Sequence, residues 1–170
     1  YRCGYSVIAP DYPGYGQSSG SLSEHGMYEA ARQAFDFLTN EQSINFDKII
    51  LCGHSLGAAA ALHLAAELSK EQKQVAGLCL ISPFATPSRC LTGRHSLVPF
   101  SESFDNLGKI PWVTCPLRVV HGMADQVIPF SHGKMLFDAS PLSLEREEKK
   151  FIEIKRGTHN NILNSREFWF

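Results

Sequence analysis

Short apolar runs alternate along the chain with longer stretches in which apolar residues recur every three or four positions. The short runs are rich in Val, Ile, Leu and Phe and end near glycine, proline or serine, a pattern typical of buried strands. They predict five strands, at residues 5–9, 48–52, 75–82, 117–121 and 151–155.

Helical periodicity lies between these runs. The first predicted helix has a single apolar stripe, formed by Met27, Ala31, Ala34, Phe35 and Leu38. The second, at residues 58–68, is apolar almost all round, so we expect it to be buried on most sides. A third helix is predicted at residues 131–139, and the charged residues 145–150 are expected to form a solvated connection.

The alternation of strands and helices indicates the fold class. Continuous apolar strands separated by helices predict an α/β protein with a mostly parallel sheet and helices on both faces. The 170 residues are enough for a single domain with a substantial core. Active sites in such sheets gather at the carboxyl ends of the strands, so we expect functional residues in the loops that directly follow strands.

The sequence Gly53-His54-Ser55-Leu56-Gly57 is a G-x-S-x-G motif between a predicted strand and a predicted helix. In that context the serine occupies a nucleophile elbow. The elbow holds the serine at positive φ, which costs about 1–3 kcal/mol. Because strand and helix almost touch there, the residues two before and two after the serine must be small, as Gly53 and Gly57 are. The motif predicts Ser55 as a nucleophile.

A serine hydroxyl needs a base, and the base needs an orienting acid, to react at neutral pH. Asp125 lies in the loop after the strand at residues 117–121, and His159 lies in the loop after the strand at residues 151–155. Both loops are expected at the same edge of the sheet as Ser55. The sequence therefore predicts Asp125 as the acid and His159 as the base.

Other acidic and histidine residues compete for these roles. Asp105 lies far from the neighbouring strand ends, and Asp138 falls inside a predicted helix. His54 lies on the same turn as the serine and is expected to point elsewhere. The other histidines also miss the strand end that follows the acid: His25, His63, His95, His121 and His132.

These motifs together resemble the serine-hydrolase branch of the α/β-hydrolase superfamily. The resemblance is carried by Gly53–Gly57, by His121-Gly122-x-x-Asp125 and by Gly157-Thr158-His159, in the order that this superfamily uses. Residues 9–20 add a turn similar to the one after the fourth strand of the family. More narrowly, the chain is similar to cap-poor α/β-hydrolase-domain proteins that include depalmitoylases and lysophospholipid or monoacylglycerol lipases. The resemblance implies an acyl-enzyme mechanism in which the Leu56 N–H stabilises the oxyanion.

The chain departs from the family pattern in two ways. Pro13 stands where the fourth-strand turn usually has an arginine. In addition, the family's third strand and the loop that donates a second oxyanion amide would precede Tyr1. The resemblance therefore implies that residues 1–170 form a single catalytic domain that is partial, running from the fourth strand to near the final helix.

The composition and charge of the chain limit the classes of binding partner that we expect. A formal net charge of −1 gives no reason to expect nucleic acid or an anionic membrane surface. No run of apolar residues is long enough for a transmembrane helix, which leaves membrane attachment to residues outside this chain. No motif indicates a metal or a nucleotide, so we expect no cofactor. The expected partner is a small-molecule or acylated substrate.

The five cysteines are scattered and form no C-x-x-C pair, which argues against a zinc site. Cys52 and Cys79 fall in apolar strand-like runs and are expected to be buried core thiols. A reducing compartment, the cytoplasm or the cytoplasmic face of a membrane, fits this usage best. A bridge between Cys90 and Cys115 stays open.

The segment between Phe84 and Pro116 has room for one helix but not for a large lid. Its apolar residues are expected either to pack the segment on the sheet or to line a groove for an acyl chain: Leu91, Leu97, Val98, Phe100, Phe104, Leu107, Ile110, Trp112 and Val113. A long-chain ester or thioester is the first expectation. The alternatives are a short-chain carboxylesterase, a peptidase of the prolyl-oligopeptidase type, and an inactive scaffold with the hydrolase fold.

Overall fold

The computed structural model describes residues 4–86, 104–144 and 146–165. The chain forms two compact units, Tyr1–Asn45 and Phe46–Phe170. The second unit contains the sheet and every residue predicted to act in the active site.

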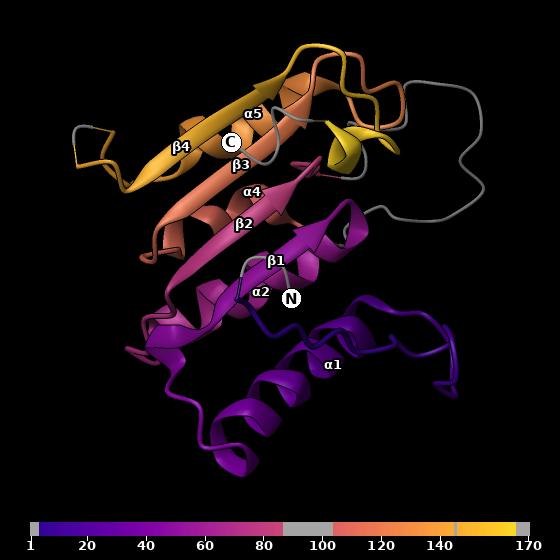
Figure 1. Ribbon diagram of the computed structural model, residues 1–170, viewed down its shortest axis with the longest axis vertical. Helices are drawn as coiled ribbons and strands as arrows, with labels where there is room; N and C mark the ends of the chain where they lie inside the picture. Colours follow the sequence, from indigo (N-terminus) through magenta and orange to yellow (C-terminus); the bar gives the residue numbers. More distant parts are fainter. Residues whose placement is uncertain (1–3, 87–103, 145, 166–170) are drawn as a thin grey trace. The chain divides into compact units, whose positions relative to one another are not determined.

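Four strands of the second unit form one parallel sheet in the order β1-β2-β3-β4 (Figure 1). They are β1 (Ile50–His54), β2 (Gly77–Ile81), β3 (Leu117–Gly122) and β4 (Lys149–Ile154). Four of the five predicted strands are thus confirmed, each with bounds within two residues of those expected. Because the strands are parallel, their carboxyl ends meet at one edge of the sheet.

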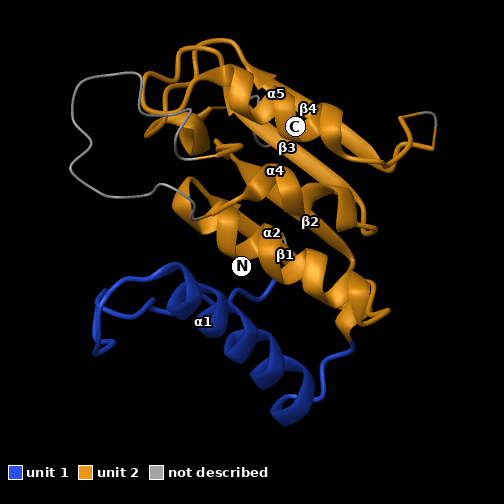
Figure 2. Ribbon diagram, turned by 180° about the vertical axis from the view of Figure 1, so that it is seen from behind, with its two compact units in different colours: residues 1–45 blue, residues 46–170 orange. Residues whose placement is uncertain are grey.

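The α-helices of this unit lie on one face of the sheet: α2 (Leu56–Lys70), α4 (Asn106–Lys109) and α5 (Phe130–Ala139) (Figures 1 and 2). Nine residues of α2 are buried, so the expectation of a helix covered on most sides is confirmed. The α/β class with a parallel sheet is confirmed as well. Short helical turns complete the unit: η2 (Phe46–Lys48), η3 (Ile110–Trp112) and η4 (Ile162–Asn164).

Strand β4 begins inside the stretch that was expected to be a solvated connection. Lys149 is only 9% exposed, and its Nζ donates hydrogen bonds to the carbonyl oxygens of Phe137 and Ser140, at 2.9 and 2.7 Å. These carbonyls lie at the carboxyl end of α5, where a helix favours a positive charge. A lysine in this position is therefore part of the strand's helix-facing side, and the expectation was wrong for residues 149 and 150.

Along β1, the described helices of this unit leave the opposite face of the sheet uncovered. Ile50 is 50% exposed, Cys52 is exposed, and Cys79 is only partly buried. The expectation of a buried core thiol was therefore wrong for Cys52, whereas Cys79 is partly buried and packs against a core cluster formed by Ile81, Val120, Ile154 and Ile162. An apolar run cannot tell which of its residues face the helices, and these two fall on the side away from α2, α4 and α5.

The segment from Phe84 to Pro116 packs part of its apolar residues into the core. Phe104, Ile110 and Val113 are at most 3% exposed, which fits the expectation that this segment packs on the rest of the domain. Trp112, by contrast, is 56% exposed. Leu107 lies in α4 and is partly buried. The remaining candidates for an acyl groove lie outside the described residues: Leu91, Leu97, Val98 and Phe100.

The first unit contains α1 (Glu24–Asp36), which continues as the π-helical turn η1 (Phe37–Glu41). Ser23 caps α1 by accepting a hydrogen bond from the Gly26 N–H at 3.0 Å. Met27 and Phe35 of the predicted stripe are buried, which confirms this helix. The strand predicted at residues 5–9 was wrong, because these exposed residues pair with no strand, and a strand needs a hydrogen-bonded neighbour to persist.

Candidate active site

Ser55 occupies the sharp turn between β1, which ends at His54, and α2, which begins at Leu56. Its backbone lies at φ 54° and ψ −118°, and a positive φ is strained for a residue with a side chain. A Cβ atom at Gly53 would overlap the carbonyl oxygen of Gly57, so Gly53 is needed for strand and helix to cross this closely. The Ser55 N–H is already used, because it donates to the carbonyl oxygen of Ile81 at 2.9 Å.

His159 lies beside the Ser55 hydroxyl. Its Nε2 is 2.9 Å from Ser55 Oγ, and its Nδ1 is 2.8 Å from Asp125 Oδ2. A carboxylate can only accept, so the Nδ1–H donates to Asp125. The neutral imidazole then has its lone pair on Nε2, where it accepts the hydrogen bond from Ser55 Oγ–H. This is the tautomer in which a histidine can remove the hydroxyl proton.

Asp125 is held in the loop after β3. Its Oδ1 accepts hydrogen bonds from the backbone N–H groups of Val127 and Ile128, both at 2.9 Å. Burial raises the pKa of the carboxyl, but the hydrogen bonds from Ile128, His159 and Val127 outweigh it, and the pKa lies below its ordinary value. Asp125 is therefore ionised at neutral pH, with its free oxygen directed at His159.

The two other aspartates considered for the role of the acid make different contacts. Asp105 caps α4 by accepting from the Gly108 N–H at 3.0 Å, and Asp138 lies in α5 beside Lys134 Nζ at 2.7 Å. The side chain of Asp138 is 59% exposed. Neither aspartate contacts His159, so the structure brings together Ser55, Asp125 and His159 and leaves the competitors apart.

Sequence reasoning did not anticipate that His54 and His121 support this group. The Nε2–H of His54 donates to the carbonyl oxygen of His159 at 3.1 Å, and the two rings lie 5.0 Å apart. The Nε2–H of His121 donates to the carbonyl oxygen of Ile128 at 3.0 Å, and this nitrogen lies 3.5 Å from Asp125 Oδ2. The only signal in the sequence was position: His54 directly precedes Ser55, and His121 ends the predicted strand that leads to Asp125.

Both supporting histidines are held neutral. Burial lowers the pKa of His121, which is fully buried, and burial together with the nearby His159 lowers the pKa of His54. A neutral imidazole with its proton on Nε2 can donate to a carbonyl without adding a positive charge. These residues can therefore fix the two loops without competing with His159 for the Asp125 carboxylate charge.

Leu56 is the first residue of α2. The first N–H groups of a helix have no partner within the helix, and the aligned peptide dipoles favour negative charge at this end. Such an N–H next to Ser55 suits an oxyanion. The role of Leu56 as an oxyanion donor stays a prediction.

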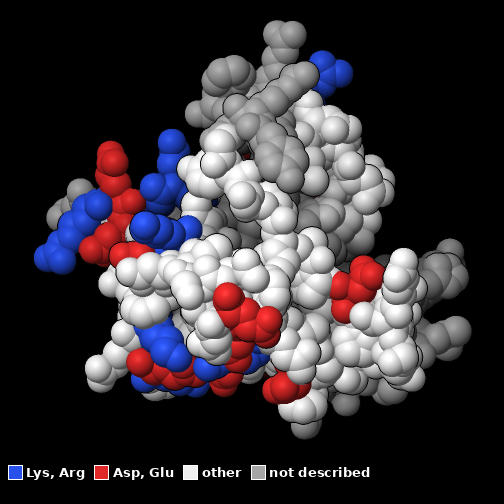
Figure 3. Space-filling view, turned by 60° about the horizontal axis from the view of Figure 1, so that its bottom comes forward, with Lys and Arg blue, Asp and Glu red and all other residues white. Residues whose placement is uncertain are grey.

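Other kinds of site find little support in the part of the chain that the structure describes. Within residues 4–86, 104–144 and 146–165, no group of three His, Cys, Asp or Glu residues is placed to hold a metal ion. The helices within the same ranges are too short or too polar to cross a membrane. On the face shown in Figure 3, described basic and acidic side chains are interspersed, and no broad basic surface appears there.

The family is shown by comparison with known proteins. The family model for the alpha/beta hydrolase fold matches residues 1–110. The chain therefore belongs to the alpha/beta hydrolase fold family, as the motifs around Ser55, Asp125 and His159 predicted.

Individual relatives agree with this assignment. The chain is 35% identical over 140 residues to the alpha/beta hydrolase domain-containing protein aho-3 of Caenorhabditis elegans, which covers 82% of this chain and 41% of that protein. It is 31% identical over 161 residues to the alpha/beta hydrolase domain-containing protein 17C of Mus musculus, covering 95% of this chain and 47% of that protein. The chain thus spans less than half the length of these two relatives.

A solved structure shows the same fold. The monoacylglycerol lipase of Paleococcus ferrophilus superposes with a TM-score of 0.62 at 19% identity, covering 88% of this chain and 73% of the lipase. At this level of identity the likeness concerns the fold alone.

Proposed function

We propose that this protein is a serine hydrolase that cleaves carboxylic ester or thioester bonds through an acyl-enzyme. The proposal rests on one observation: Ser55, at its strained turn, is joined to His159 at 2.9 Å and through it to Asp125 at 2.8 Å. A serine in such a chain of hydrogen bonds becomes a nucleophile at neutral pH.

In the first half of the proposed reaction, Ser55 Oγ attacks the acyl carbonyl carbon while His159 Nε2 takes the hydroxyl proton. Asp125 stabilises the imidazolium that forms, since its carboxylate already accepts from Nδ1–H. The Leu56 N–H stabilises the tetrahedral oxyanion. The intermediate then expels the alcohol or thiol, which leaves with the proton carried by His159.

In the second half, water attacks the acyl-enzyme and His159 again serves as the base. The same geometry is used twice, because the departed leaving group frees the position in front of Nε2 for a water molecule. Collapse of the second oxyanion releases the carboxylic acid and restores the Ser55 hydroxyl.

Esters and thioesters are favoured as substrates over peptides. The chain resembles hydrolase-domain proteins that act on acyl groups, and a monoacylglycerol lipase shares its fold. Phe104, Ile110 and Val113 are buried, and α4 and η3 pack against α2, so this described part of the segment after β2 belongs to the core. We propose an acyl substrate on these grounds, with the acyl length left to measurement.

A fluorophosphonate probe tests the nucleophile. The tryptic peptide of residues 49–70 contains two serines, Ser55 and Ser69, and Ser69 lies near the far end of α2. Wild-type chain and Ser69→Ala are expected to carry the probe on this peptide, while Ser55→Ala loses the label and lowers hydrolysis of p-nitrophenyl esters by orders of magnitude. Labelling of Ser55→Ala at the wild-type rate would remove Ser55 from the mechanism.

The substrate class is tested on the same protein. Rates are compared for p-nitrophenyl esters of increasing acyl length, the matching thioesters and a peptide anilide. Faster cleavage of esters or thioesters supports the proposal, and preferential cleavage of the anilide would identify a peptidase instead. A full-length protein that neither takes the probe nor cleaves any of these compounds would be a scaffold with the hydrolase fold.

A further inference from the structure

Cys52 and Cys79 lie side by side in the sheet. They are register partners on the adjacent parallel strands β1 and β2. Neighbouring strands lie about 4.8 Å apart, which falls within the range of about 4.4–6.8 Å between Cα atoms that a disulfide can span. Partners in register point to the same side of a sheet, so the two thiols share one face.

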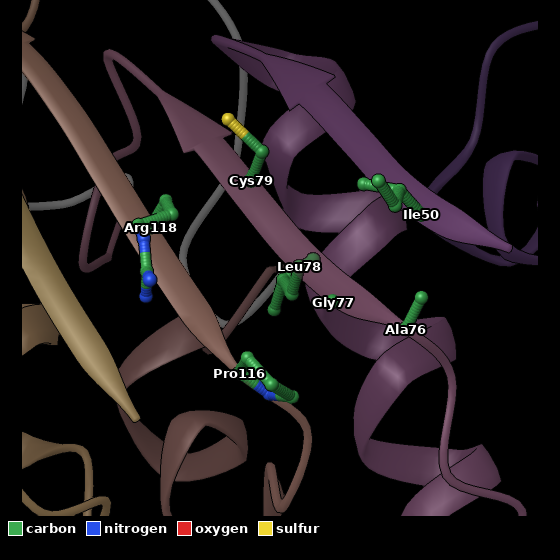
Figure 4. A pocket seen from close by; sticks show the side chains of 7 residues that line it. All are labelled: Ile50, Ala76, Gly77, Leu78, Cys79, Pro116 and Arg118. Carbon is green, nitrogen blue, oxygen red and sulfur yellow. The ribbon is translucent and has the colours of Figure 1, made fainter. Parts of the chain in front are cut away.

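The shared face is the one that α2, α4 and α5 leave open. Cys52 is exposed and Cys79 is partly buried, and both are free thiols. A cavity of about 200 Å³ opens beside Cys79, and its lining also includes Ile50 and Arg118 (Figure 4). This cavity lies toward the amino ends of the strands, away from Ser55, so small reagents can reach the thiols without entering the proposed active site.

The two thiols are chemically unequal. The hydrogen bond from the Cys79 thiol lowers the pKa of Cys52 to about 7, although burial opposes this effect. The same hydrogen bond, followed by burial, raises the pKa of Cys79. Near neutral pH Cys52 therefore has a large thiolate fraction while Cys79 stays a thiol, the division of roles found in attacking and resolving cysteines.

We propose that Cys52 and Cys79 form a redox modification site in which a peroxide converts the pair to a disulfide. The Cys52 sulfur attacks one peroxide oxygen, the O–O bond breaks, and hydroxide leaves, so that sulfur is oxidised to a sulfenic acid and the peroxide is reduced. The Cys79 sulfur then displaces the sulfenic hydroxyl, which leaves as water with the thiol proton. Two thiols and one hydrogen peroxide become one disulfide and two waters.

Cys115 provides an internal contrast. It is 1% exposed, and burial raises its pKa to about 11. A buried thiol of this kind reacts slowly with peroxide because the thiolate is the reacting form. The proposal thus assigns reactivity to the pair on the open face and inertness to the thiol in the core.

Peptide mapping tests the proposal. The native chain is treated with hydrogen peroxide, its remaining thiols are blocked with iodoacetamide, and it is digested with trypsin without reduction. Residues 49–70 and residues 74–89 form tryptic peptides with one cysteine each. The expected product is these two peptides joined, lighter than their sum by two hydrogens and separated again by dithiothreitol.

Matched variants separate the two proposed steps, formation of the Cys52 sulfenic acid and formation of the disulfide. Cys115→Ser is expected to form the same bridge, whereas Cys79→Ser should stop at the Cys52 sulfenic acid and be trapped by dimedone. Attachment of Cys52 to any other cysteine, or a native chain in which both thiols stay alkylatable after peroxide, would overturn the proposal.

Phenylarsine oxide gives a readout without an oxidant. It binds two neighbouring thiols with loss of one water, so native protein is expected to lose both alkylatable thiols at once, and Cys79→Ser should keep its Cys52 thiol alkylatable. Retention of both thiols in the native protein would show that the pair is not accessible as a unit. Because neither measurement uses turnover, failure here leaves the proposed role of Ser55 standing.

Discussion

Gly122 and Gly157 nearly touch: a Cβ atom at Gly122 would overlap the carbonyl oxygen of Gly157. Gly122 ends β3, three residues before Asp125, and Gly157 follows β4, two residues before His159. The Ala124 N–H also donates to the Gly157 carbonyl oxygen at 3.0 Å. This close backbone approach joins the loop of the acid to the loop of the base.

Replacing Gly122 by alanine tests that approach. The added methyl group must push backbone atoms apart, so Gly122→Ala is expected to lower the free energy of unfolding by about 1–3 kcal/mol. Urea unfolding measures the change. Gly77→Ala is the control, because a Cβ there would lie 3.3 Å from the Pro116 carbonyl oxygen and needs only a small adjustment. Equal costs at both positions would contradict this interpretation.

Asp125→Asn tests the tautomer of His159. An amide nitrogen facing Nδ1 would donate to it, which places the imidazole proton on Nε2 and leaves no lone pair for the Ser55 hydroxyl. Ester turnover is expected to fall by about 10⁴-fold in kcat. Asp138→Asn removes an exposed carboxylate beside Lys134 and should change turnover little. A fall of less than tenfold for Asp125→Asn would rule out the proposed role of Asp125.

The strain at Ser55 predicts a reversal of the usual glycine penalty. At φ 54° a glycine is relaxed while alanine is not, so Ser55→Gly should be more stable than Ser55→Ala, by about 1 kcal/mol in urea unfolding. At Ser69, which lies inside α2, the alanine variant should instead be more stable than the glycine variant, because glycine costs about 1 kcal/mol relative to alanine in a helix. The same sign at both positions would show that the turn is not strained.

Stability is expected to fall on mild acidification. Since burial lowers the pKa of His121 and of His54 in the folded protein, the unfolded chain binds more protons once the pH drops below the ordinary value of 6.5. The free energy of unfolding should therefore decrease from pH 7 to pH 5. His121→Gln keeps a donor for the Ile128 carbonyl oxygen and should reduce this slope by up to about 1.4 kcal/mol per pH unit.

Urea unfolding at several pH values measures that slope. His25→Gln is the matched control, since His25 is exposed on α1, and its slope should equal that of the wild type. An unchanged slope in His121→Gln would mean that this imidazole does not resist protonation in the folded state.

The order of elements and the three side chains that meet at the candidate site were accessible from sequence, because each of the three follows a strand signal directly. The glycines around Ser55 and the loops after successive strands are features of the local sequence, which is why they could be predicted. The side of the sheet on which Cys52 and Cys79 lie was not accessible, since it depends on where the helices pack. Residues 5–9 were predicted as a strand because their side chains favour one. A strand also needs a neighbouring strand to pair with, and the sequence pattern does not show whether that neighbour is present.

The support from His54 and His121 escaped prediction for a different physical reason. Both contacts run from an imidazole to a backbone carbonyl, His159 in one case and Ile128 in the other. Any residue type can supply a backbone carbonyl oxygen, so no sequence motif indicates which residue will accept the hydrogen bond. Only the folded loops show that the two histidines stand beside the acid and the base.

The strands follow one another across the sheet in the order in which they are synthesised. Ser55 comes directly after the first of them, and His159 comes after the last. An emerging polypeptide can thus add each strand to the one before it, yet its serine meets no base until the final strand has docked. Under the proposed mechanism, a chain that ends before β4 lacks His159, and its Ser55 would stay an unactivated alcohol.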